Sequence, residues 1–197
     1  MTNSKRQQQR AAQRKKQSRR KILIYGGLGL LSAALVLGIA YLASRAPGGL
    51  LGEAVVVSGA EHVAEGSDPG PYASNPPAGG RHYASELEAG FYEENDPAAG
   101  LPYPEGPLVH NLEHGYVIFW YNCAAYTGDC AELKQTIRAV MDKAGNTKLI
   151  AFPWTDMLVP LAMTSWGRIL EFDQPDSDLM VAFARNNLNH APESYAD

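Results

Sequence analysis

The segment at residues 22–43 constrains the chain most strongly, because its 22 residues include no charged side chain. At the rise of an α-helix, a segment of this length spans about 33 Å, close to the roughly 30 Å hydrocarbon core of a bilayer. A cleaved signal peptide is the alternative, but its apolar core is usually about 7–15 residues long. The best cleavage candidate also contains Arg45 and is followed by Pro47. We therefore predict an uncleaved transmembrane helix.

Charge is divided unevenly between the two sides of this segment. Nine basic and no acidic residues lie in residues 1–21, whereas the chain beyond Ala46 has 7 basic and 21 acidic residues. Because basic residues mark the cytoplasmic side of a membrane helix, we expect a cytoplasmic N-terminus and an extracytoplasmic C-terminal domain. The expected partner is the lipid bilayer, and an acidic domain would repel nucleic acid. The predicted organisation of this single-pass cell-membrane protein is a basic tail at 1–21, a helix at 22–43, a linker at 44–54 and an exported domain at 55–197.

Cys123 and Cys130 are the only cysteines in the chain. In an exported domain, a lone pair that closes a short loop is typical of a disulfide. Their spacing is not Cys-x-x-Cys, so neither a thioredoxin-type redox site nor a zinc knuckle fits. We predict a disulfide between them, with a pair of thiolate metal ligands as the alternative.

Regular secondary-structure patterns are concentrated in the second half of the chain. The patterns predict strands at 116–121 and 148–152, a helix at 131–144, one strand bent at Gly167 over 161–172, and a helix at 178–187 with Leu179, Phe183 and Leu188 inward. An edge strand is expected at 55–57, and the Gly- and Pro-rich segment 62–107 shows no helical period over most of its length. Following the membrane helix, we therefore expect a small α+β domain. It would have one mostly antiparallel sheet, two helices on one face and a long loop-rich N-terminal segment.

Four of the five histidines form the candidate functional set. His110 and His114 are four residues apart, which places both imidazoles on one side of a helical turn or a strand. Glu113 lies between them as a ligand, an acceptor for one imidazole, or a base. His62 and His82 lie in the adjoining irregular segment. We predict that these five residues form a metal site; the alternative is a set of packed, hydrogen-bonded histidines.

Two further patterns bear on the chemistry. The string His110-x-x-Glu113-His114 matches the His-x-x-Glu-His signature of a class of zinc peptidases. That signature needs a well-formed helix, and the strand pattern that follows Gly115 leaves room for about one turn. Met157 and Met163 would add thioether ligands suited to copper, although methionine beside apolar residues usually fills a core. No Gly-x-Ser-x-Gly motif supports a serine nucleophile, so no catalytic residue is assigned.

Several short motifs follow one another in a defined order along the domain. They are His62-Val-Ala-Glu-Gly, Asn75-Pro-Pro-Ala-Gly-Gly-Arg-His-Tyr, Gly90-Phe-Tyr, Leu108-Val-His-Asn-Leu-Glu-His-Gly-Tyr-Val-Ile and Ala162-Met-Thr-Ser-Trp-Gly-Arg. In this order they resemble a bacterial family, the domain-of-unknown-function family numbered 3105. The match runs across most of the exported domain, and the block beginning at Leu108 is its most specific part. Where the family usually has Pro-Pro-Thr-Ser-Gly-Pro-His, this chain keeps the histidine but differs in the turn.

The resemblance implies an N-terminal anchor and no mechanism. It favours the four histidines as a set, because they lie inside the motifs while His190 lies outside. The sequence thus predicts a membrane-anchored extracytoplasmic domain that binds a transition metal, copper or zinc, without an organic cofactor. The alternative is a non-catalytic accessory or interaction subunit of a membrane or envelope complex. An exported zinc peptidase is the third possibility.

Overall fold

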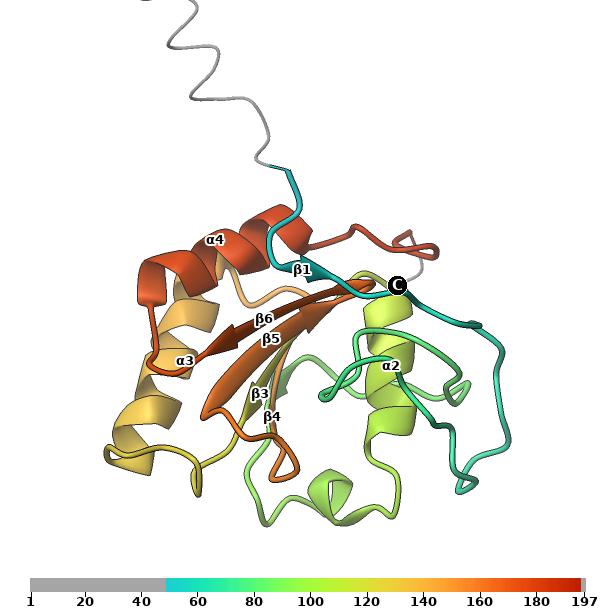
Figure 1. Cartoon of the computed structure of the whole chain (residues 1–197), viewed down its shortest axis with the longest axis horizontal. Helices are drawn as coiled ribbons and strands as arrows, with labels where there is room; N and C mark the ends of the chain where they lie inside the picture. The colour runs from blue at the N-terminus through green and yellow to red at the C-terminus, as the bar shows by residue number, and fades with distance from the viewer. Residues whose placement is uncertain (1–48, 196–197) are drawn as a thin grey trace, which may run out of the picture. The chain divides into compact units, whose positions relative to one another are not determined.

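A computed structural model describes residues 49–195, which contain one mixed sheet and three α-helices (Figure 1). The strands are β1 (Glu53–Ala54), β2 (Gly90–Phe91), β3 (Val117–Tyr121), β4 (Leu149–Pro153), β5 (Leu161–Ser165) and β6 (Arg168–Phe172). The helices are the 3-10 turn η1 (Pro97–Gly100), α2 (Glu105–Glu113), α3 (Cys130–Ala144) and α4 (Ser177–Asn187). Across the sheet the strands lie in the order β1-β6-β5-β3-β4-β2.

The predicted fold class was wrong in its sheet and in its helices. Strand β4 runs parallel to both β2 and β3, while β5 is antiparallel to β3 and β6. The sheet is therefore mixed, because α3 connects β3 to β4 as a crossover, and such a connection allows parallel pairing. The third helix, α2, was not expected, since the sequence predicted only the elements that correspond to α3 and α4.

The predicted transmembrane helix at 22–43 lies outside the described residues, as does the predicted tail at 1–21. Among residues 49–195, no helix is long and apolar enough to cross a membrane. The membrane-spanning part of the predicted fold class therefore has no counterpart among the described residues. The predicted cell-membrane location and lipid partner stay predictions.

Strand β3 lies at the centre of the domain, and all five of its residues are buried. Alternate side chains of a strand point to opposite faces of the sheet. Val117, Phe119 and Tyr121 accordingly pack into an apolar cluster with α3 and α4. Ile118 and Trp120 pack into a second cluster with α2. Helices thus cover both faces, with α2 on the opposite side from α3 and α4 (Figure 1), and not one face as predicted.

Helix α2 was not predicted because its sequence lacks the alternation of apolar and polar residues that is typical of an amphipathic helix. Every residue from Gly106 to Glu113 is buried, so the helix has no polar face to produce a periodic pattern. Pro107 lies in the first turn, where its missing N–H has no intrahelical partner to lose. Gly106 is packed so closely that a Cβ there would lie 2.5 Å from the ring of Tyr83. Tertiary packing, not local propensity, therefore forms this helix.

The remaining elements agree with the sequence in type more than in detail. Helix α3 begins after Asp129, whose carboxylate accepts from the Ala131 N–H, and ends at Gly145 with a φ of 113°. The single bent strand expected at 161–172 is a hairpin of β5 and β6. Helix α4 buries Phe183 as predicted, but Met180 points inward in place of Leu179, which is 38% exposed.

Candidate metal centre

Two parts of the chain meet at the histidines. Helix α2 carries His110 and Glu113, and His114 caps its C-terminus. The loop-rich segment supplies His62 and His82, which pair as an isolated parallel bridge. The bridge is held by hydrogen bonds from the Val63 N–H to the His82 carbonyl (2.7 Å) and from the His82 N–H to the Glu61 carbonyl (3.3 Å). Residues far apart in sequence therefore reach one place through backbone pairing.

Four of the five predicted residues come together at this place. His62, His82, His110 and Glu113 each offer a donor atom, and these atoms lie within 4.8 Å of one another. The Nε2 of His62 is 3.3 Å from the Nδ1 of His110, and the Nε2 of His82 is 2.9 Å from Oε2 of Glu113. Two ligands of a tetrahedral zinc ion, each bound at about 2.0–2.1 Å, lie roughly 3.3 Å apart. The group can therefore hold a metal ion after only small shifts.

His82 is oriented by a hydrogen bond on the far side of its ring. Its Nδ1 lies 2.8 Å from the Gly80 carbonyl oxygen, which can only accept, so Nδ1 carries the proton. In a neutral ring, Nε2 then presents a lone pair. This atom is buried and lies 2.9 Å from Oε2 of Glu113. A nitrogen and a carboxylate oxygen this close are joined by a cation that both can bind, either a proton or a metal ion.

His110 is held in the neutral form that a metal requires. Burial lowers its pKa to about 4, and repulsion from the imidazoles of His114, His82 and His62 adds to the effect. A neutral imidazole keeps a lone pair on one ring nitrogen, whereas a protonated one has none. His110 is therefore available as a ligand throughout the physiological pH range.

His114 lies beside this group but belongs to a second one. That group consists of Glu86, His110 and His114, again with donor atoms within 4.8 Å of one another. The Nδ1 of His114 is 3.2 Å from Oε2 of Glu86, and its Nε2 is 3.7 Å from Oε2 of Glu193. The predicted set of five is thus divided between two neighbouring groups that share His110. The ligand assignment stays a prediction.

Sequence reasoning missed Glu86 and Glu193. Glu86 is one of many acidic residues in an irregular segment, and no spacing relates it to His114, 28 residues later. Glu193 reaches the site because its backbone N–H donates to the Glu113 carbonyl oxygen at 3.0 Å. Neither contact leaves a local signal in the sequence, so only the tertiary structure could identify them.

Helix α2 also changes the assessment of the peptidase signature. The expected single turn is instead a helix of nine residues, with His110 and Glu113 in its second half. That expectation was wrong because the helix already begins at Glu105, with Gly106 and Pro107 in its first turn. Glu113, however, faces His82, and is thus engaged by the first group of donors.

The sulfur atoms lie away from both histidine groups. Cys123 and Cys130 form the predicted disulfide in the connection between β3 and α3, so they offer no thiolates. Met157 belongs to the apolar cluster around α2, and Met163 to the cluster under α3 and α4. Both methionine side chains are buried among the apolar residues of these clusters. The thioether argument for copper therefore finds no structural support.

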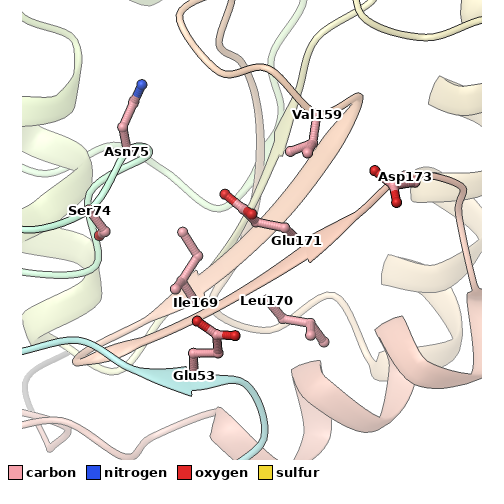
Figure 2. Close-up of a pocket in the computed structure, with 8 residues that line it drawn as sticks. All are labelled: Glu53, Ser74, Asn75, Val159, Ile169, Leu170, Glu171 and Asp173. Atoms are coloured by element: carbon pink, nitrogen blue, oxygen red, sulfur yellow. The ribbon is translucent and has the colours of Figure 1, made fainter.

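An open cavity of about 470 Å³ lies apart from the histidines. Glu53, Glu171 and Asp173 line one side of it, and Figure 2 shows Glu171 pointing toward the loop of Ser74 and Asn75. None of the candidate metal ligands lines this cavity. The histidine groups are therefore sets of side chains packed against one another, apart from this cavity.

The sequence matches the profile of a family described as "Protein of unknown function (DUF3105)" over residues 62–197. The chain belongs to this family. No curated protein and no solved structure matches it. The DUF3105 match begins at His62 and extends to the end of the chain, so it contains every residue of both donor groups. It confirms the family indicated by the ordered motifs, and it assigns no activity.

Proposed function

We propose that this DUF3105 domain binds a transition-metal ion between His62, His82, His110 and Glu113. The observation that carries the proposal is the buried pair of His82 Nε2 and Glu113 Oε2, which lie 2.9 Å apart beside His62 and His110. Burying a polar atom without a partner costs free energy, and buried carboxylates are normally paired or bound to a metal. A divalent cation bound by both atoms, in place of a shared proton, avoids both costs.

The surroundings of the group agree with metal coordination. Ligating histidines usually donate their second ring N–H to a carbonyl or carboxylate, which fixes the ring orientation. His82 does so through Nδ1 to the Gly80 carbonyl oxygen. His62 is exposed while the other three donors are buried, so an ion can enter from the solvent side. The acidic domain favours the approach of cations.

Among transition metals, the donors favour zinc. Three imidazoles and one carboxylate are nitrogen and oxygen ligands typical of Zn²⁺, whereas Cu(I) prefers thiolate and thioether sulfur and Cu(II) prefers a square-planar or tetragonal arrangement of nitrogen and oxygen ligands. The His62 and His110 nitrogens, 3.3 Å apart, are near the separation of two tetrahedral zinc ligands, whereas the His82 and Glu113 atoms, 2.9 Å apart, would have to move apart slightly. Four protein donors fill that geometry, which is typical of a structural or storage site and not of a catalytic one.

The test is metal content of the complete chain, purified through a histidine-free affinity tag and dialysed against equal, limiting Zn²⁺ and Cu²⁺. We expect the wild type to retain about one zinc ion per chain. A His190→Ala control should retain the same amount, because His190 is outside both donor groups. His82→Ala and Glu113→Gln should each lose this ion while keeping the circular dichroism spectrum of a folded domain. Two different substitutions are used so that misfolding of one variant does not decide the result.

A folded wild type that takes up no metal would contradict the proposal. The histidines would then form a hydrogen-bonded polar core, as in the alternative of a non-catalytic interaction module. Stronger retention of copper than of zinc would keep the metal site and overturn the choice of zinc.

A further inference from the structure

A second group of donors lies directly beside the first and has no assigned role. Glu86, His110 and His114 each offer one ligand atom, and these atoms lie within 4.8 Å of one another. The two groups have one member in common, His110. The inference drawn from this group rests on the proposed function, since it concerns a neighbour of the first metal position.

His114 faces carboxylates on both sides of its ring. Nδ1 is 3.2 Å from Glu86, and Nε2 is 3.7 Å from Glu193. The residue is 9% exposed, and the side chains of Glu86 and Glu193 border its ring. A buried imidazole between two carboxylates is an arrangement that attracts a cation, either a proton on the ring or a metal ion beside it.

His110 can serve both groups because its ring has two nitrogens. Nδ1 is used on the first side, where it lies 3.3 Å from Nε2 of His62. Nε2 is the nitrogen that remains for the second side. The ring of His114 lies one helical turn further along α2, and the two ring centroids are 4.3 Å apart. Both imidazoles offer a ligand atom within 4.8 Å of the Glu86 carboxylate.

The second group is more open than the first. The side chains of Glu86 and Glu193 are 39% and 59% exposed, so solvent reaches this side of the cluster. The first group supplies four donors and the second supplies three. Three protein ligands with an open position for water are typical of reactive zinc sites, whereas four ligands are typical of structural ones.

The C-terminal segment completes the second group. The Asn189 N–H donates to the Gly115 carbonyl oxygen at 2.9 Å, and the Glu193 N–H donates to the Glu113 carbonyl oxygen at 3.0 Å. Gly115 has a φ of +84°, and a Cβ there would lie 2.7 Å from the Cα of Asn189. The close contact holds this segment against the end of α2, where Glu193 can neutralise added positive charge.

We infer that the domain holds a second transition-metal ion at Glu86, His114 and Nε2 of His110, and that the His110 ring bridges the two ions. The second ion takes the place of the proton on that nitrogen, and the proton is released to solvent. The bridging ring is then an imidazolate with one nitrogen bound to each ion. Water occupies the open position of the second ion.

Metal stoichiometry of the complete chain tests the second position. After dialysis against excess Zn²⁺, the wild type should retain two ions per chain and Glu86→Gln should retain one. Glu88→Gln is the matched control, because Glu88 is exposed, two residues away and outside the donor groups, and it should retain two. One ion in the wild type, unchanged by Glu86→Gln, would overturn the inference but keep the proposed function. No ion at all would overturn both.

The bridge has its own signature when Cu²⁺ fills both positions. An imidazolate couples the two unpaired electrons, so the integrated electron paramagnetic resonance signal should fall well below two spins per chain. Glu86→Gln should restore the signal of one isolated ion. Two full, independent spins in the wild type would overturn the shared ring.

Discussion

The two faces of the sheet are covered in different ways. On one face, the apolar sides of α3 and α4 pack against β3, and these side chains form an apolar cluster. On the other, α2 packs Leu108 and Leu112 against the sheet and turns His110 and Glu113 to the opposite side. The loop-rich segment then covers those polar side chains. One sheet thus supports a hydrophobic layer and a layer that encloses a charged site.

The difference has an energetic consequence. Apolar burial stabilises the α3 and α4 face without any ligand, at roughly 25 cal/mol per Å². The other face buries imidazoles and a carboxylate, which costs free energy unless each has a partner. Stability contributed by the first face should therefore be independent of metal, and stability contributed by the second should depend on it.

The largest expected effect is loss of a core side chain on the apolar face. Phe183 is fully buried in α4, and Phe183→Ala should lower the free energy of unfolding by about 3–5 kcal/mol. Urea denaturation of the metal-free protein measures the change. Leu179→Ala on the same helix is the control, because that side chain is 38% exposed and should lose far less. Equal effects of both substitutions would mean that α4 does not pack as described.

The second effect separates the two faces directly. At a free zinc concentration about 100 times the dissociation constant, binding to the folded state alone should add about 2.7 kcal/mol to the free energy of unfolding. Glu113→Gln should abolish this gain, whereas Phe183→Ala should retain it despite its lower starting stability. Thermal or urea unfolding with and without zinc provides the measurement. An equal zinc gain in wild type and Glu113→Gln would exclude Glu113 as a ligand.

The sequence was informative about the two faces to different degrees. The stripe of Leu133, Ile137, Val140 and Met141 identified α3, and all four residues are buried as expected. Such periodicity is local, and it arises because one side of the helix faces water. Helix α2 has no exposed side, so the same reasoning could not detect it. The parallel pairing of β3 and β4 was missed because strand direction depends on the path of the crossover.

The candidate site shows the same division. The short interval between His110 and His114 marked the place, and the two rings do lie side by side on α2. His62 and His82 could be selected only as histidines in a neighbouring segment and in motifs of the resembling family. Their approach depends on the backbone bridge between two loops. The division of the residues into two groups depends on Glu86, which no sequence interval indicates.

A third prediction uses pH to examine the metal-free polar face. The pKa of His110 is lowered from 6.5 to about 4, so between these values the unfolded chain binds a proton that the folded chain does not. Stability is therefore complete above about pH 6.5 and declines as the pH falls toward 4, by on the order of 2 kcal/mol. Urea midpoints across this range provide the measurement.

His110→Gln should flatten that decline, while His190→Gln, outside the groups, should leave it unchanged. Acid sensitivity elsewhere falls in a different window. The Lys134 ammonium and the Arg138 guanidinium lower the pKa of Glu93, so the stability from that carboxylate is lost only as the pH falls below about 4.5. A decline that persists in His110→Gln would assign the acid sensitivity to groups other than this imidazole.

The smallest effect concerns the start of α4, far in sequence from the metal ligands. The Asp176 carboxylate accepts hydrogen bonds from the Asp178 and Leu179 N–H groups, at 3.1 and 3.0 Å. Removing such a cap costs about 1 kcal/mol, so Asp176→Ala should lower the urea midpoint slightly and Asp176→Asn much less. Zinc should add the same stabilisation to both variants as to the wild type. If zinc stabilised Asp176→Ala less than the wild type, the two faces would be coupled through the sheet. Their contributions to stability would then not be independent.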